Sequence, residues 1–353
     1  MNADSQHRQG GDPRGRGPVR LDLSTCVNAY GPPDTVIEAL RSLPPEAIRA
    51  HPYQAADDVE AAYAAYLGQP QGELIAGRGT SDLIWTLARH LDGKTIGLPL
   101  PAYTEFRQAF PQARTFGGGP CAHPLGVLDT AMRACDAIII SNPHNPTGQI
   151  LPRADLAGIA AQHPACILVT DESYMDFLPG HAATTLAGCD LDNIIVLRSP
   201  SKFFGLAGAR SGAAWTRHPL RTQWRRQRTS WPVSAFAAQA LETALADTAW
   251  AATARQSLAD DAAWLDRAMA PSGLRITPSR LHFRLLTGSA ADVTSFAGSL
   301  DSGGIAVRVL EEAYGAGTPA VRITAPRRQD RDKLASALGR QATDRSHRGQ
   351  AAR

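Results

Sequence analysis

Short apolar runs alternate with longer amphipathic stretches along most of the chain. Residues 59–67 carry apolar side chains at helical spacing and end at Gly68, so they predict a helix that stops at this glycine. Residues 83–90 predict a second helix, capped by the Thr-Ser-Asp sequence at 80–82. Residues 152–162 predict a third helix between two apolar runs.

Three compact apolar runs predict strands that are buried on both faces. They lie at residues 137–140, 166–170 and 193–197, and none of them alternates with polar residues. Residues 95–98 predict a further short strand. Because strands alternate with helices, we expect a mainly parallel sheet with helices on both faces.

The pattern changes after residue 232. Residues 233–269 predict one long Ala-rich helix, and residues 282–286, 305–309 and 320–324 predict the short strands of a smaller α+β unit. The expected organisation is a disordered tail (1–20), an N-terminal arm joining the small domain (21–45), a large domain (46–232), an interdomain helix with the small C-terminal domain (233–340), and a second disordered tail (341–353).

Composition is that of a soluble globular protein. The 353 residues are 43% hydrophobic and 20% charged, with a net charge of +3. The densest basic run, residues 221–228, has four arginines and one Trp, and we interpret it as a solvated helix face rather than a nucleic-acid site. The only lysines are Lys94, Lys202 and Lys333, so chemistry that needs an amine is easy to localise.

Signals for export, membrane insertion and metal binding are absent from the sequence. The five cysteines have no CxxC pairing and no His partner at metal spacing. No apolar run approaches the roughly 18 residues that span a bilayer. We therefore expect a cytoplasmic protein with reduced thiols, no metal, and neither membrane nor nucleic acid as a partner.

Unusual polar residues follow each of the three buried strands. They are residues 141–149 (SNPHNPTGQ), 171–174 (DESY) and 198–202 (RSPSK). Proline fixes the backbone and donates no hydrogen bond, so we expect the first of these loops to be rigid. Ligands of open α/β sheets bind beyond the carboxyl ends of the strands, where an amide, a carboxylate, a phenol and an amine are predicted to meet.

These motifs resemble those of the fold-type I pyridoxal-phosphate enzymes, in the class I/II aminotransferase group. The resemblance covers residues 22–338 and rests on N-P-x-N-P-T-G, D-E-x-Y, and S-x-S-K followed by Arg210. VNAYGPP, HPY, AGRGTSD and GIAVR…VRITAP are most similar to histidinol-phosphate aminotransferases and threonine-phosphate decarboxylases. The resemblance implies an α/β fold with a mainly parallel seven-stranded sheet sandwiched by helices, as in aspartate aminotransferase, plus a smaller α+β domain.

The resemblance assigns catalytic roles to residues of the three motifs. Lys202 would form the Schiff base with pyridoxal phosphate and shuttle a proton, since Lys94 lies in a turn and Lys333 in a late polar helix. Asp171 would pair with the protonated pyridine nitrogen, the alternative being a helix cap. Tyr174 and Asn145 would hydrogen-bond the phenolic oxygen of the cofactor; ordinary packing is the alternative for Tyr174.

The resemblance also implies a phosphate site and a shared dimer. Phosphate would be bound by backbone amides at a helix N-terminus and by hydroxyl and guanidinium groups, namely Gly79, Thr80, Ser81, Ser199, Ser201 and Arg210. Tyr103 would stack on the pyridine ring, unless it is a core aromatic. Tyr53 would reach the phosphate of the neighbouring subunit, which implies a homodimer with shared active sites.

Four further residues are candidates for substrate contact. Arg322 matches the family arginine that grips the substrate carboxylate, and Tyr30 would line the substrate entrance. Arg308 would either contact a distal substrate group or be an ordinary strand-edge arginine. His144 would either face the substrate pocket as an acid–base or recognition group or cap its own loop, and we prefer the loop cap.

The predicted reaction is a ping-pong transamination between an L-amino acid and a 2-oxo acid, in amino-acid biosynthesis. Glu311 and Glu312 stand where relatives that use phosphorylated substrates place basic residues, which favours a neutral or cationic substrate such as a guanidino acid. Histidinol-phosphate aminotransferase is the alternative. A threonine-phosphate-type decarboxylase or a C–S lyase would share the cofactor residues, whereas a transcription factor would need a DNA-binding domain that residues 1–21 are too few to form.

Overall fold

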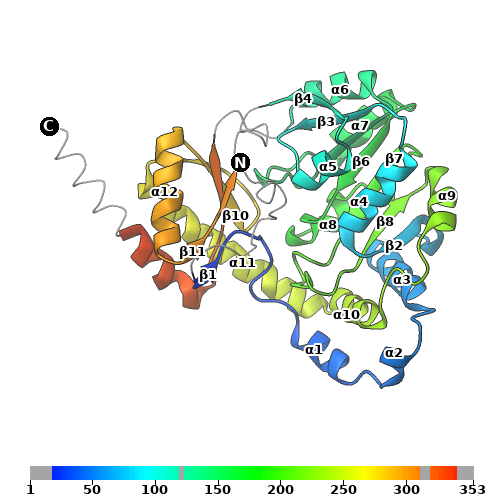
Figure 1. The fold of residues 1–353 in the computed structure, drawn as a ribbon, viewed down its shortest axis with the longest axis horizontal. Coiled ribbons are helices and arrows are strands. Elements are labelled where there is room, and N and C mark those ends of the chain that lie inside the picture. Colours follow the sequence, from blue (N-terminus) through cyan, green and yellow to red (C-terminus); the bar gives the residue numbers. More distant parts are fainter. Residues whose placement is uncertain (1–17, 119–122, 311–318, 340–353) are drawn as a thin grey trace.

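The large sheet has seven strands and is mainly parallel. The computed structural model describes residues 18–118, 123–310 and 319–339 (Figure 1). The strand order is β2 (Leu74–Gly77), β8 (Gly212–Thr216), β7 (Ile194–Arg198), β6 (Ile167–Asp171), β5 (Ala137–Ser141), β3 (Ile96–Leu100) and β4 (Arg114–Gly117). Only β8 runs antiparallel to its two neighbours within this sheet, so the predicted fold class is confirmed.

Helices cover both faces of this sheet, as the compact apolar runs predicted. In β5, Ile138 and Ile140 pack into one core and Ile139 into another, because successive strand residues point to opposite faces. The first core is completed by α3 (Ala55–Leu67), α6 (Leu125–Ala134), α7 (Arg153–Gln162) and α10 (Ala235–Ala246). The second core is completed by α4 (Gly79–His90), α5 (Thr104–Ala109) and α9 (Leu220–Gln227).

The second sheet has four antiparallel strands. Their order is β12 (Arg308–Leu310), β13 (Ala320–Thr324), β10 (Phe283–Thr287) and β9 (Arg275–Thr277), covered by α12 (Ala290–Ser302). The predicted strand 305–309 is two strands, because β11 (Ile305–Ala306) leaves this sheet and pairs in parallel with β1 (Leu21–Asp22). The two strands form a separate two-stranded sheet, which joins the arm near the N-terminus to the segment that precedes β12.

Two helix predictions need correction. Helix α4 begins at Gly79, so residues 80–82 form its first turn rather than its cap, and Asp82 Oδ2 accepts a hydrogen bond from the backbone N–H of Arg78 at 3.0 Å. The predicted helix 233–269 is two helices, α10 and α11 (Thr248–Met269), which meet at Asp247. Asp247 accepts a hydrogen bond from the backbone N–H of Trp250 at 3.0 Å and caps α11.

The basic run at 221–228 was predicted to be a solvated helix face. The structure shows that only part of it is solvated. It lies on α9, but Trp224 is buried, and Arg225 and Arg228 each bond to the buried carboxylate of Glu60 at 2.7 Å. These contacts join α9 to α3. Two of the four arginines therefore have a structural role within the protein.

The remaining elements are short. They are α1 (Asp34–Arg41), α2 (Glu46–Arg49), α8 (His181–Thr184), a helix over 331–339, and the 3-10 turns η2 (Gln71–Glu73), η3 (Met175–Phe177), η4 (Ala270–Ser272) and η6 (Arg328–Asp330). Among the described residues, no helix combines the length and apolar character needed to cross a membrane. The predicted tails lie almost entirely outside the described residues, and the domain limits stay a prediction.

Candidate active site

Three neighbouring parallel strands bring their carboxyl ends together. Ser141 pairs with Asp171 and Asp171 with Leu197, so the ends of β5, β6 and β7 lie side by side. Backbone hydrogen bonds continue past the strands, from Asn142 N–H to Asp171 O at 3.0 Å and from Glu172 N–H to Leu197 O at 2.9 Å. The three polar motifs therefore meet at one edge of the sheet.

Lys202 supplies the amine at this edge. Its Nζ donates to the carbonyl of Thr25 at 3.2 Å, and it interacts electrostatically with Asp171, Arg210 and Arg322. Burial lowers the pKa of Lys202. A neutral amine is the form that attacks an aldehyde, so the surroundings of Lys202 favour Schiff-base chemistry.

The other lysines have different surroundings. Lys333 is paired with Asp330 at 2.7 Å, and Lys94 is exposed in the turn before β3. Neither lies at the carboxyl end of a strand of the large sheet.

Asp171 is a buried carboxylate at the end of β6. Its Oδ1 accepts hydrogen bonds from the backbone N–H and the hydroxyl of Ser173, at 2.9 and 2.5 Å. Burial raises the pKa of Asp171, while the bonds from Ser173 and the charges of Lys202 and Arg198 lower it. A buried carboxylate is costly unless it meets a cation, and a protonated pyridine nitrogen is such a cation.

Asn145 is held from the small sheet. Arg322, on β13, donates to the side-chain oxygen of Asn145 and to the carbonyl of Ser24, each at 2.6 Å. Because the oxygen of Asn145 is directed at Arg322, its NH₂ group is the part that can meet a cofactor oxygen. Tyr174 is buried, and burial raises its pKa, so its phenol stays protonated and able to donate.

His144 is buried between its own loop and the loop that follows β3. Its Nε2 lies 3.0 Å from the carbonyl of Pro101, which only accepts, so Nε2 carries the proton. Its Nδ1 lies 2.7 Å from the hydroxyl of Thr147, which accepts from the backbone N–H of Gln149 at 3.2 Å and donates to Nδ1. Both ring nitrogens are thus used inside the protein, which favours the loop-cap interpretation. Burial lowers the pKa of His144 to about 4.

The N-terminus of α4 and Arg210 form a cradle for an anion. Gly79 has a φ of +80°, and a Cβ added there would lie 3.0 Å from Nη2 of Arg210. At Gly212, an added Cβ would lie 2.7 Å from the Arg198 carbonyl and 3.2 Å from the Cα of Gly79, so this helix end abuts the lysine segment. Free N–H groups of the first turn and a guanidinium suit a phosphate.

The hydroxyls of the lysine segment lie beside this cradle. The hydroxyl of Ser199 donates to that of Ser201 at 2.8 Å, and both side chains are buried. The backbone of Arg210 has a φ of +56°, a conformation that few residues other than glycine adopt and that recurs at functional sites. An amine, a buried carboxylate and a phosphate cradle are the groups that pyridoxal phosphate requires, and together they fit it.

Comparison with known proteins decides the family. Residues 19–338 match the family model of the aminotransferases of class I and II. The chain belongs to this family.

Known histidinol-phosphate aminotransferases are similar to this aminotransferase. That of Shewanella amazonensis is 31% identical over 301 residues, covering 79% of this chain and 80% of the relative. That of Paramagnetospirillum magneticum is 30% identical over 335 residues, covering 90% of each. The enzyme is therefore a pyridoxal-phosphate-dependent aminotransferase, and the predicted cofactor and reaction class are confirmed.

Solved structures share the fold. The histidinol-phosphate aminotransferase of Sinorhizobium meliloti in complex with pyridoxal-5'-phosphate aligns with a TM-score of 0.83 at 22% identity, covering 98% of this chain and 95% of that one. L-threonine-O-3-phosphate decarboxylase of Porphyromonas gingivalis aligns with a TM-score of 0.72 at 21% identity, covering 90% and 98%. Both support the fold-type I assignment.

The aminotransferase also uses residues 24–28, none of which the sequence analysis assigned to the site. Carbonyls of Ser24 and Thr25 bond Arg322 and Lys202, as described above, and Asn28 donates its backbone N–H to Lys202 O at 2.9 Å. Cys26 has a φ of +54°, and its carbonyl accepts a hydrogen bond from Nε2 of the buried His282 at 3.1 Å. Most of these contacts involve backbone groups, which leave no signature in the sequence.

The aromatic candidates are placed differently from one another. Tyr103 is partly buried at the start of α5, with its ring 5.6 Å from that of Phe106. Tyr53 is 73% exposed and packs edge-on against Trp231 at 5.9 Å. Such exposure suits a residue that serves a second subunit; that role and the homodimer stay predictions.

Tyr30 is directed at the helix between the two sheets. Its hydroxyl donates to Asp261 on α11 at 2.7 Å, and Asp261 also accepts from Arg331 at 2.7 Å. Burial and the hydrogen bond to Asp261 raise the pKa of Tyr30 to about 12. This hydroxyl therefore stays protonated and joins the N-terminal arm to α11, and its role at the substrate entrance stays a prediction.

The arrangement supports proton transfer beside a bound cofactor. When bound, pyridoxal phosphate supplies an electron sink for the electrons released at the carbon that bears the amino group. Asp171 would hold the ring nitrogen, Asn145 and Tyr174 would orient the ring, and the cradle at Gly79 would hold the phosphate. Lys202, whose pKa is lowered by burial, would accept and return the proton at its Nζ.

Proposed function

We propose that this aminotransferase transfers the amino group of histidinol phosphate to a 2-oxo acid. The observation that carries this proposal is a pair of arginines: Arg308 on β12 lies directly opposite Arg322 on β13. Residues directly opposite each other on antiparallel strands have Cβ atoms about 4.5–5.5 Å apart on one face, where like charges repel. Two neighbouring guanidinium groups attract an anionic substrate group, and both histidinol phosphate and a 2-oxo acid carry one.

The location of the pair supports the proposal. Arg322 interacts electrostatically with Lys202 and donates to Asn145 at 2.6 Å, so positive charge gathers next to the amine. The preference for a neutral or cationic substrate rested on Glu311 and Glu312, which lie outside the described residues. The described part of the site therefore favours the alternative substrate, histidinol phosphate. The curated relatives named above are histidinol-phosphate aminotransferases.

A donor screen tests this function. The holoenzyme is assayed with histidinol phosphate, histidinol and L-arginine as amino donors and 2-oxoglutarate as acceptor. We expect kcat/KM for histidinol phosphate to exceed that for histidinol by about 10- to 100-fold, since charge-assisted hydrogen bonds contribute about 1.5–3 kcal/mol. Preference for L-arginine contradicts the proposed substrate. The first half-reaction releases at most one oxo product per bound cofactor without a 2-oxo acid, so product release over many turnovers without any 2-oxo acid contradicts transamination and indicates a decarboxylase or a lyase.

A variant of the arginine pair gives the matched control. Arg308→Gln removes one charge and retains hydrogen-bonding groups, so kcat/KM for histidinol phosphate is expected to fall about tenfold, or about 1.4 kcal/mol. The value for histidinol, which lacks the phosphate, is expected to change less than threefold. Equal losses for both donors count against phosphate recognition by this arginine.

A further inference from the structure

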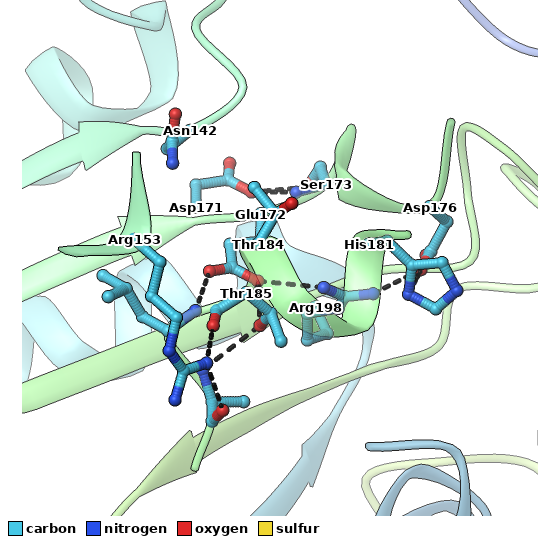
Figure 2. Close-up of polar contacts among 12 residues, drawn as sticks. Asn142, Arg153, Asp171, Glu172, Ser173, Asp176, His181, Thr184, Thr185 and Arg198 are labelled. Atoms are coloured by element: carbon cyan, nitrogen blue, oxygen red, sulfur yellow. Dashed lines mark hydrogen bonds and ion pairs between the residues drawn. The ribbon is translucent and has the colours of Figure 1, made fainter. Parts of the chain in front are cut away.

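An enclosed cluster of ionisable side chains lies next to the cofactor carboxylate. Arg198, Glu172 and Asp176 form this Arg198 cluster, and their side chains are at most 1% exposed (Figure 2). Nη1 of Arg198 donates to Glu172 Oε2 at 2.9 Å, and Nη2 donates to Asp176 Oδ1. Figure 2 shows the guanidinium between the two carboxylates, with Asp171 and Ser173 next to Glu172.

Polar groups from several elements surround the cluster. Glu172 also accepts from the hydroxyl of Thr185 at 2.5 Å and the backbone N–H of Leu186 at 2.8 Å. Asp176 accepts from the hydroxyl of Tyr66 on α3 at 3.0 Å, and His181 Nδ1 lies 3.9 Å from its carboxylate. The cluster thus joins the ends of β6 and β7 to α3 and to the segment around α8.

The cluster is connected to the cofactor site through the backbone. Glu172 directly follows Asp171, and Arg198 directly precedes the segment that carries Ser199 and Lys202. The backbone N–H of Glu172 donates to Leu197 O at 2.9 Å. Since successive strand residues point to opposite faces, the ion pair fixes two strand ends from the face opposite Asp171.

The charges of the cluster also act on Asp171. Three carboxylates, at 171, 172 and 176, lie within six residues and are all buried, and Arg198 is fully buried beside them. Burial raises the pKa of Asp171 and of Glu172, and the charge of Arg198 lowers both. Burial alone lowers the pKa of Arg198, but Asp176 and Glu172 raise it above its ordinary value, so Arg198 stays charged.

Stability alone is a weak reason for such a cluster. Buried ion pairs are often replaceable by apolar residues at no cost, because desolvation offsets their attraction. Among the described residues, Nε of Arg198 and Oδ2 of Asp176 find no hydrogen-bond partner, and each such buried atom costs about 1–3 kcal/mol. An arrangement this costly points to a role at the neighbouring site.

We propose that Arg198 is a positioning residue for the cofactor, which holds Asp171 and Lys202 in place through Glu172 and Asp176. Arg198 lies on the face of the large sheet opposite Asp171, and it contacts neither cofactor nor substrate. Its positive charge additionally lowers the pKa of Asp171 and so favours the ionised carboxylate opposite the ring nitrogen. The proposal rests on the cofactor site and is independent of which amino donor the enzyme uses.

The test compares cofactor binding in two arginine variants of the full chain. Arg198→Met removes the charge and leaves two buried carboxylates, and Arg198→Lys retains the charge. Arg284→Met is the control, because Arg284 on β10 of the small sheet is 4% exposed and pairs with Asp266 on α11 at 2.5 and 2.8 Å. The Kd of pyridoxal phosphate for the apoprotein and the pH dependence of the visible absorption band are measured in each variant.

We expect Arg198→Met to raise the Kd of pyridoxal phosphate at least tenfold and to shift the pH dependence of the band, and Arg198→Lys to restore part of both. Arg284→Met is expected to leave both within threefold of the wild type. A triple variant, Arg198→Met with Glu172→Gln and Asp176→Asn, removes the uncompensated charge and serves if the single variant does not fold. Unchanged cofactor affinity in Arg198→Met overturns the proposal. Wild-type affinity in the triple variant also overturns it, because neutralisation alone would then restore binding.

Discussion

The enclosed histidine of the loop after β5 leads to a prediction about pH. Both ring nitrogens of His144 are used by neutral partners, and burial lowers its pKa from 6.5 to about 4. The unfolded chain therefore binds a proton at this residue at higher pH than the folded protein. Its contribution to stability is intact above pH 6.5 and is lost as the pH falls from 6.5 toward 4.

The size of this loss follows from the two pKa values. Between about pH 7.5 and about pH 5.5, one histidine with these values destabilises the fold by about 1.3 kcal/mol. His123 and His282 are also buried, with pKa values lowered by burial to about 2 and about 3. They act in the same direction, whereas the raised pKa values of Asp171 and Glu172 act in the opposite one.

A single variant isolates the contribution of His144 from the other groups. His144→Asn removes the titrating ring and leaves the other groups in place. The free energy of unfolding is measured in urea for the apoproteins at both pH values. We expect the loss on acidification to be about 1.3 kcal/mol smaller in the variant than in the wild type. Equal losses in the two proteins refute the assigned environment.

The tautomer gives an independent check. In the wild type labelled with ¹⁵N histidine, the signal that disappears in His144→Asn belongs to His144. NMR should find its proton on Nε2 and no titration above about pH 5. A proton on Nδ1, or titration near the ordinary value, contradicts the two hydrogen bonds and reopens an acid–base role.

Three substitutions test other parts of the structure. Gly79→Ala places a Cβ 3.0 Å from Arg210 Nη2 at a φ of +80°, so we expect pyridoxal phosphate to bind at least tenfold more weakly; unchanged affinity contradicts the cradle. Glu60→Gln leaves Arg225 without its buried carboxylate partner, so the free energy of unfolding in urea is expected to fall by about 2 kcal/mol. A fall below about 0.5 kcal/mol contradicts a structural role of this ion pair. Arg322→Lys keeps the charge but loses the two directed hydrogen bonds, so kcat/KM is expected to fall at least tenfold, and wild-type kinetics count against its role.

Sequence predicted the large sheet well because its central strands are buried on both faces. Each of β5, β6 and β7 ends one residue later than its apolar run, since Ser141, Asp171 and Arg198 are polar but still part of the ladder. The break at Asp247 was missed because Ala-rich sequence continues on both sides of it. Periodicity does not detect a single capping residue inside a helical stretch.

The site was predictable where side chains carry the chemistry and unpredictable where contacts cross the chain. Lys202, Asp171 and Asn145 follow strand ends within recognisable motifs, whereas the bond from Arg322 to Asn145 joins residues 177 positions apart. Arg198 stood in a recognised motif, but only the folded protein shows its partners. The spacing of motifs along the chain predicts which residues meet at the edge of the sheet. It does not predict the contacts of Arg198 with Glu172 and Asp176.

Trapping the cofactor on the protein tests the central claim most directly. The holoenzyme is reduced with borohydride and digested, and the modified peptide is identified by mass spectrometry. With only Lys94, Lys202 and Lys333 in the chain, the attachment site is unambiguous. We predict one pyridoxyl group on Lys202 and none in Lys202→Ala. A cofactor adduct on another lysine, or one that persists in Lys202→Ala, would contradict the active site described above.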